Sequence, residues 1–325
     1  EFMKDEDLYL KIKEGARNQA AAQIFNIMNS DEKTEKFINA YKKMSDQQIE
    51  IMARFLKIPN QHYETYRALV RGEDNNFTKC LSEFNEKNML RAGDVILMCG
   101  TSRPSKILLE LQKRTYSEAR SSHVALVYSE FVAVDAMPEI GVSMRLITEV
   151  LTNAEKNWRI IRFKNLNNSH YEKFLQGGAF YLAQPYSIRP KKGNGKNFSY
   201  CSELVRKIYR GLEINNTGIP NNLIIKPCDF DKLADTSSSW EDITESVKDY
   251  IDFCEDFESI IRSISKLQID GLKLNQSRYE ERRKYLQIAH QAYKKGAITQ
   301  EKLGEVKRTV RQIEDQLNFK FWRYM

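Results

Sequence analysis

The sequence lacks long apolar runs and paired cysteines. No stretch reaches the roughly eighteen consecutive apolar residues of a membrane-spanning helix, so we expect none. The five cysteines are an odd number, and none stands in the CxxC spacing of a zinc site or fits a disulfide framework. A reducing compartment is therefore the expected folding environment. The chain also contains no internal repeat and no low-complexity block.

The N-terminus shows no secretion signal. Glu1-Phe2 before Met3 is typical of a cloning remnant, and the residues that follow are charged rather than apolar. We therefore expect a cytoplasmic protein, or one that is exported without a classical signal peptide.

Charge is distributed unevenly along the chain. The net charge is +7 over 325 residues, a basic balance that favours acidic partners. Residues 236–260 contain eight acidic residues against one lysine, whereas residues 262–325 contain fifteen Lys or Arg against seven Asp or Glu. The basic tail could bind an anionic membrane surface or an acidic protein partner, or it could neutralise the acidic segment of its own chain. No recognition motif accompanies the charge, so nucleic-acid binding is not expected.

Apolar periodicity divides the chain into three regions. Residues 1–88 show helical spacing and predict a helical N-terminal region. Residues 89–235 combine short apolar runs typical of strands with amphipathic helices, which indicates an α+β domain. Residues 236–325 begin with a Ser/Thr linker and predict an acidic helix and then a basic helical hairpin. The expected seam of that hairpin has a spacing of three and four: Leu303, Val306, Val310, Ile313 and Leu317.

Two apolar runs in the middle region, 124–127 and 131–134, predict a β-hairpin. If residues 128–130 form a three-residue loop, His123 lies opposite Asp135 and both side chains share one face of the sheet. A two-residue loop would shift the register by one residue. The two side chains would then point to opposite faces, unless a bulge corrected the register.

A cysteine opens an amphipathic helix farther along the chain. This helix is expected to end near Gly211. Cys201 lies in its first turn, where unpaired N–H groups and the helix dipole stabilise a thiolate. His123 could deprotonate the thiol and then protonate the leaving group, and Asp135 could orient the imidazole. We therefore predict Cys201, His123 and Asp135 as catalytic residues. The histidine precedes the cysteine, which reverses the order of most thiol hydrolases.

Five segments resemble a known family in their sequence and order. They are Arg-Ala-Gly-Asp-Val-Ile-Leu (91–97), Ser-Ser-His-Val-Ala-Leu-Val (121–127), Val-Asp-Ala (134–136) with Gly141-Val142, Tyr-Cys-Ser-Glu-Leu-Val (200–205) and Lys-Pro-Cys-Asp-Phe (226–230). This order resembles circularly permuted NlpC/P60 proteins, the papain-like amidases of the YaeF/YiiX type, over residues of about 89–235. The resemblance implies a catalytic domain with an antiparallel sheet and a nucleophile helix, flanked by helical regions.

By this resemblance the family's nucleophile falls on Cys201, its histidine on His123 and its acidic residue on Asp135, where many relatives have Glu. Asp94, in a Gly-Asp turn, corresponds to a strand-entry residue with a structural role. The Cys201 backbone N–H is the oxyanion donor that the helix start predicts, and a second donor is not recognisable. Neither a cofactor nor a metal site is expected.

Three functions follow as alternatives. The first is a thiol-dependent hydrolase, an amidase or cysteine peptidase, that cleaves a peptide or isopeptide through an acyl-enzyme. The second is an acyltransferase or thioesterase of the lecithin:retinol acyltransferase type, which uses the same His-before-Cys order on acyl substrates. The third is a non-catalytic interaction protein that binds through its basic tail. A catalytic core framed by helical extensions would also suit a secreted bacterial effector.

Overall fold

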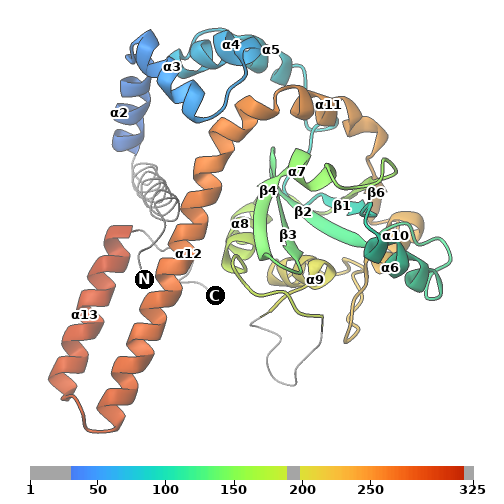
Figure 1. Ribbon diagram of the computed structural model, residues 1–325. Helices are drawn as coiled ribbons and strands as arrows, with labels where there is room; N and C mark the ends of the chain where they lie inside the picture. The colour runs from blue at the N-terminus through green and yellow to red at the C-terminus, as the bar shows by residue number, and fades with distance from the viewer. Residues whose placement is uncertain (1–30, 189–197, 318–325) are drawn as a thin grey trace, which may run out of the picture. The chain divides into compact units, whose positions relative to one another are not determined.

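The computed structural model describes residues 31–188 and 198–317 (Figure 1). The chain forms two compact units: one is Met44–Ser265, and the other combines Glu1–Lys43 with Lys266–Met325. Over the described residues, no helix has both the length and the apolar character needed to cross a membrane.

A six-stranded antiparallel sheet lies at the centre of the larger unit. The strands are β1 Val95–Met98, β2 His123–Ser129, β3 Val132–Met137, β4 Gly141–Leu146, β5 Arg159–Phe163 and β6 Trp240–Asp242, in the spatial order β4-β3-β2-β1-β5-β6. All of β1 and the interior of β2 are buried. Both strands are therefore continuous apolar runs, as expected where a sheet is covered on both faces.

Helices cover this sheet within the larger unit. They are α6 Arg103–Lys113, α7 Ile147–Leu151, η1 Asn168–His170, α8 Tyr171–Phe180, α9 Cys201–Gly211 and α10 Pro227–Thr236. The apolar stripe of α9 packs against β2 and β3, and α8 packs beside α9. The mixed fold agrees with the α+β class and the nucleophile helix that the sequence predicts.

Helices from both flanks of the sequence also belong to the larger unit. They are α3 Asp46–Phe55, α4 Asn60–Arg71, α5 Asn76–Leu81, η2 Glu245–Val247, α11 Lys248–Asp256 and the start of α12 Glu258–Lys294. Aromatic rings join them to the β2–β3 turn: Phe77 lies 5.4 Å from Phe253, and Phe131 stacks on Tyr250 at 6.3 Å. The Tyr250 hydroxyl donates to the carbonyl of Glu130 at 3.0 Å. One aromatic core therefore ties α5 and α11 to the sheet.

The smaller unit is helical over its described residues. It contains α2 Asp31–Lys42, the remainder of α12 and α13 Gln300–Leu317. Gly296 has φ 72° and follows the end of α12, and the Thr299 hydroxyl caps the start of α13 by accepting the N–H of Lys302 at 3.2 Å. Leu303 and Val310 of the predicted seam are buried. The side chains of Ile313 and Leu317 lie outside the described residues.

The hairpin differs from the sequence prediction. The turn is the two-residue Glu130-Phe131, not 128–130, because β2 continues to Ser129 and β3 begins at Val132. The pairing shifts between Val127 and Ser129, so Tyr128 is an extra residue that forms a β-bulge. His123 and Asp135 are therefore not directly opposite, and the two-residue turn with a correcting bulge is the alternative that the sequence left open. The bulge nevertheless keeps both side chains on one face, as diagonal rather than direct neighbours.

The side chain of the bulge residue is fixed by α8. The Tyr128 hydroxyl donates to the carbonyl of Leu175 at 3.1 Å. A Cβ at Gly178 would come within 2.6 Å of the Tyr128 ring, so glycine is needed there. Packing between the hairpin and α8 thus stabilises the bulge.

The acidic segment also differs from the helix that was expected. After the Ser/Thr segment the chain first adds strand β6 to the edge of the sheet, next to β5. Trp240 explains this, because its buried ring lies 5.3 Å from Phe163 and 5.5 Å from Tyr209. Its indole N–H donates to the carbonyl of Thr217 at 2.7 Å. The buried Trp240 side chain therefore holds the acidic residues that follow it in strand β6.

Candidate active site

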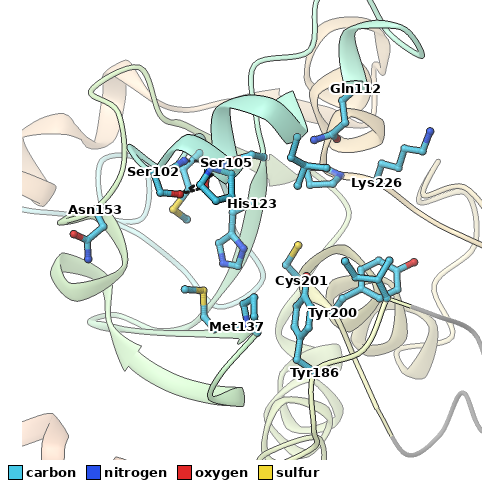
Figure 2. A pocket seen from close by; sticks show the side chains of 18 of the residues that line it. Ser102, Ser105, Gln112, His123, Met137, Asn153, Tyr186, Tyr200, Cys201 and Lys226 are labelled. Atoms are coloured by element: carbon cyan, nitrogen blue, oxygen red, sulfur yellow. Dashed lines mark hydrogen bonds between the residues drawn. The ribbon is translucent and has the colours of Figure 1, made fainter. Parts of the chain in front are cut away.

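A cleft of about 660 Å³ opens where the N-terminus of α9 meets the start of β2. Cys201 and His123 both line it, and Figure 2 shows the imidazole facing the thiol across the cleft. The volume lies within the range of small-molecule sites. The predicted nucleophile and base therefore share one accessible cavity.

Cys201 is the first residue of α9, after an extended Tyr200. Its sulfur lies 3.8 Å from the Ser202 hydroxyl, and the backbone N–H of Val124 also hydrogen-bonds to it. Burial raises the pKa of the thiol, but the charge and hydrogen bond of His123 and these two donors outweigh burial and hold the pKa below its ordinary value. The site therefore favours a thiolate.

His123 connects the thiol to a carboxylate. Its Nε2–H donates to Asp135 Oδ2 at 2.9 Å, which leaves Nδ1 for the Cys201 sulfur. Burial alone would lower the pKa of His123, but the negative charge of Cys201 and the hydrogen bond to Asp135 raise it to about 10. A thiolate and an imidazolium therefore form the favoured pair near neutral pH.

The carboxylate of Asp135 is completely buried and has two cationic partners. Besides His123, Arg145 forms an ion pair with it, and the Arg145 Nε–H donates to Oδ1 at 3.3 Å. Burial raises the pKa of Asp135, but the hydrogen bond and charge of His123 and the charge of Arg145 lower it below its ordinary value. Asp135 therefore stays ionised and can orient a charged imidazole.

The structure brings all three predicted side chains together and adds two that sequence reasoning missed. Arg145 comes from β4, two residues beyond Ser143, the direct cross-strand partner of Asp135. No spacing in the sequence could reveal Arg145, because β4 itself was not predicted. Tyr186 lies beside Cys201 (Figure 2), and burial and the negative charge of Cys201 raise its pKa. It follows Pro185 in a loop, where sequence offers no signal.

The other acidic residue of the family resemblance lies away from the thiol. Asp94 precedes β1, whereas the cleft is lined by Met98 at the far end of that strand. The buried Asp94 carboxylate accepts two hydrogen bonds from Arg162, both at 2.7 Å, and the N–H of Arg91 at 2.8 Å. These contacts agree with a structural role. Within residues 31–188 and 198–317, no cluster of three or more His, Cys, Asp or Glu could hold a metal ion.

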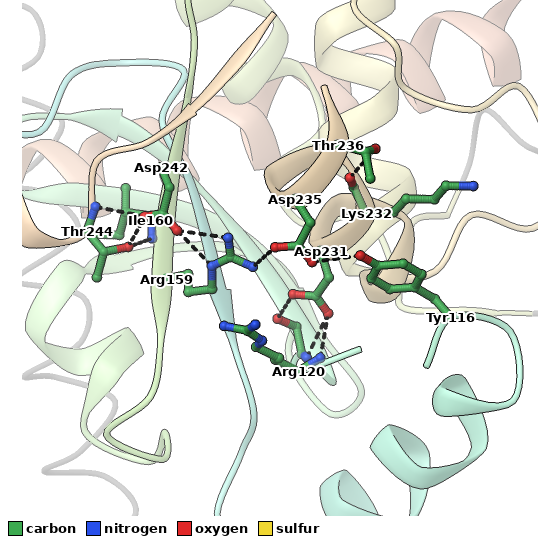
Figure 3. Close-up of polar contacts among 11 residues, drawn as sticks. Tyr116, Arg120, Arg159, Ile160, Asp231, Lys232, Asp235, Thr236, Asp242 and Thr244 are labelled. Carbon is green, nitrogen blue, oxygen red and sulfur yellow. Dashed lines mark hydrogen bonds and ion pairs between the residues drawn. The ribbon is translucent and has the colours of Figure 1, made fainter. Parts of the chain in front are cut away.

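A third buried carboxylate fixes the segment that precedes His123. Asp231 of α10 accepts the N–H groups of Arg120 and Ser121, both at 2.9 Å, and the Ser121 hydroxyl at 2.7 Å (Figure 3). Nearby, Arg159 bridges α10 and β6 through ion pairs with Asp235 and Asp242. Helix α10 therefore holds the start of β2 in place.

Replacing Asp231 with alanine is expected to destabilise the protein by about 2–4 kcal/mol, because two backbone N–H groups lose their acceptor. Asp231→Asn, which keeps one oxygen acceptor, should lose less. Urea unfolding of the three proteins measures both effects. Asp252→Ala, a change of an exposed carboxylate beyond the first turn of α11, is the control and should unfold like the wild type. Equal stability of the wild type and Asp231→Ala would contradict the role assigned to this carboxylate.

Replacing Arg145 is expected to change both the stability and the pH profile of activity, because it removes the ion pair with Asp135. Arg145→Gln should lower the free energy of unfolding by about 3 kcal/mol, because it leaves a buried carboxylate with one fewer cation. It should also raise the pKa of Asp135, so that the acidic limb of the activity profile moves to higher pH. Arg145→Lys retains a positive charge, so its acidic limb should lie closer to the pH at which the wild type has it. An unchanged pH profile in Arg145→Gln would show that Arg145 does not act on the carboxylate.

Comparison with known proteins gives one family. Residues 89–247 match a family described as permuted papain-like amidase enzymes, YaeF/YiiX, C92 family, which confirms the resemblance inferred from the sequence motifs. Among solved structures, the chain is similar to the metalloprotein yiiX from Escherichia coli O157:H7. The identity is 22% over 45% of this chain and 81% of that chain, with a TM-score of 0.33. No curated protein matches the chain.

Proposed function

We propose, from the match of residues 89–247 to permuted papain-like amidases, that the protein is a thiol-dependent hydrolase of the NlpC/P60 type. Cys201 is the nucleophile, His123 the general base and acid, and Asp135 the orienting carboxylate. The observation that carries the proposal is the buried chain of contacts from the Cys201 thiol through His123 to Asp135, placed at the wall of an open cleft.

The first half of the reaction forms an acyl-enzyme. The Cys201 thiolate attacks the carbonyl carbon of the substrate, and the negative charge that develops on the carbonyl oxygen is stabilised by the Cys201 N–H at the start of α9. As the tetrahedral species collapses, the bond to the leaving group breaks, and the His123 imidazolium gives that group its proton. A thioester on Cys201 and a neutral His123 remain.

The second half releases the acyl group. His123, now neutral, takes a proton from water, and the resulting hydroxide attacks the thioester carbon. The carbon–sulfur bond breaks, the carboxylic acid leaves, and the thiolate–imidazolium pair is restored. Asp135 stays ionised throughout and stabilises the imidazolium at each stage. Acyl transfer to another acceptor would use the same first half.

Mass spectrometry of the protein after incubation with electrophilic substrates tests this proposal. Amide and acyl-ester probes should each leave an acyl group on the peptide that contains Cys201. Hydroxylamine should remove it, because it is a thioester. Faster acylation by the amide would support an amidase, and faster acylation by the ester would support acyl-ester chemistry. Undiminished turnover in Cys201→Ala would exclude the mechanism.

A further inference from the structure

An arginine outside the residues that match the family contacts the catalytic domain from α12. The family match ends at residue 247, whereas Arg262 lies in the second turn of α12. Its guanidinium donates to Glu149 Oε1 of α7 at 2.5 Å and also pairs with Glu258 of its own helix. The side chains of Arg262 and Glu149 are 36% and 29% exposed, so solvent screens their ion pair only in part. The C-terminal helical region therefore supplies a partly buried charge to the catalytic domain.

Helix α7 connects this charge to the wall of the cleft. It follows β4 directly and packs against both the sheet and α11 (Figure 1). The second carboxylate oxygen of Glu149 accepts the N–H of Leu146 at 3.0 Å and so caps the start of the helix. Val150, the next residue of α7, lines the active-site cleft. Arg262 thus contacts the residue that fixes α7 beside the cleft.

Arg145 lies close to both Asp135 and Glu149. Its guanidinium forms the ion pair with the buried Asp135 carboxylate, and its Nη1 lies 3.5 Å from the backbone carbonyl oxygen of Glu149. The carboxylate of Glu149 can turn toward the same guanidinium, because it is carried by the residue whose backbone already contacts Arg145. Arg262 instead holds that carboxylate on the side of α12. Two carboxylates therefore lie within reach of Arg145, and a second arginine engages one of them.

We infer that Arg262 is a positioning residue of the active site, which pairs with Glu149 and so leaves Arg145 to Asp135. The inference rests on the proposed function, in which Asp135 orients His123. Without Arg262, the Glu149 carboxylate would lose this ion pair and would compete with Asp135 for the Arg145 guanidinium. Asp135 would then share its cation, and its pKa would rise.

The pH profiles of Cys201 alkylation by iodoacetamide and of 4-nitrophenyl acetate turnover test this inference. In Arg262→Gln the acidic limb of both profiles should move to higher pH by about half a unit, which lowers turnover on that limb about threefold. Arg262→Gln/Glu149→Gln should return the limb to its wild-type position. Glutamine at 149 cannot form an ion pair with Arg145, but it still offers an oxygen to the Leu146 N–H. A purely structural role of Arg262 would not be restored by removing a second charged side chain.

Three further variants isolate the contact. Glu258→Gln removes the other ion pair of Arg262 and is the matched control, which should keep the wild-type profile. Arg262→Lys keeps the positive charge beside Glu149, so its acidic limb should lie close to that of the wild type even if its stability differs. In an Arg145→Gln background, Arg262→Gln should cause no further shift, because the cation for which the two carboxylates compete is absent.

The failures of the two ideas can be distinguished. Unchanged profiles in Arg262→Gln would overturn the inference, and so would a shift that persists in Arg262→Gln/Glu149→Gln. Either result leaves the hydrolase proposal standing, provided that acyl probes still modify Cys201. If alkylation shifts as expected but no ester or amide acylates Cys201, the hydrolase proposal is wrong. The contact of Arg262 would in that case set the reactivity of the thiol alone.

Discussion

Turnover falls by on the order of 10⁴-fold or more when Cys201 is replaced with alanine, if the proposed mechanism is correct. The alanine side chain cannot form a thioester, and direct attack by water would have to proceed without the buried pair of Cys201 and His123. The change removes little volume at a buried position, so thermal unfolding should be affected far less than activity. Steady-state kinetics on the best acyl substrate measures the loss.

Two further variants refine this result. Cys201→Ser keeps the shape of the site but replaces the thiolate with a hydroxyl of much higher pKa, so it should remain nearly inactive. Cys80→Ala changes a partly exposed cysteine on α5 and should keep full activity. Full activity of Cys201→Ala would exclude both the hydrolase and the acyl-transfer mechanisms.

Replacement of His123 with asparagine should reduce turnover by about 10²- to 10⁴-fold, because the acid and base of both half-reactions is lost. The thiol should lose reactivity as well. His123 holds the pKa of Cys201 below its ordinary value, so in His123→Asn that pKa rises and alkylation by iodoacetamide near neutral pH slows. Peptide mapping of protein that has been alkylated over a range of pH measures the change in the pKa of Cys201.

Cys80 supplies a reference within each sample, since it is the partly exposed cysteine remote from His123 in sequence and element. Its alkylation should not differ between the wild type and His123→Asn. If Cys201 shows the same pH profile in both proteins, His123 does not set the charge of the thiol, and the base must be sought elsewhere.

The free energy of unfolding should also depend on pH through the raised pKa of His123. The pKa of His123 in the folded protein, about 10, is above its ordinary value of 6.5. A raised pKa means that the protonated form is bound more tightly in the folded state. The protonated His123 therefore contributes its full share of the free energy of unfolding below about pH 6.5, and this share is lost as the pH rises through about 10. The difference in unfolding free energy between the wild type and His123→Asn should shrink across this window, along with the alkaline limb of activity.

The sequence was most informative where the signal was local. The apolar stripe behind Cys201 and the β-branched run behind His123 identified the helix and the strand, because each pattern depends on neighbours within a few residues. Asp135 lies within hydrogen-bond distance of His123, but through a bulged two-residue turn instead of the three-residue loop. The bulge at Tyr128 depends on packing against α8, which no pattern within the hairpin contains.

The residues that were missed depend on contacts between distant segments. Arg145 reaches Asp135 because β4 lies next to β3, and Tyr186 reaches Cys201 through a bridge to Ser199. Trp240 turned a segment expected to be helical into a strand through contacts with β5 and α9. The anionic partner expected for residues 262–325 stays a prediction.

The bulge at Tyr128 makes the active site depend on the number of residues in the hairpin as well as on their identity. From the pairing of Ser129 with Val132, an unbulged ladder would turn His123 and Asp135 to opposite faces of the sheet. A chain that kept Tyr128 but paired it with Ala133 would therefore separate base from carboxylate, whereas loss of Tyr128 itself would leave Val127 opposite Ala133 and both side chains on one face. Deletion of one residue from within a strand, between His123 and Val127 or between Ala133 and Asp135, would by contrast turn one of the two catalytic side chains to the other face.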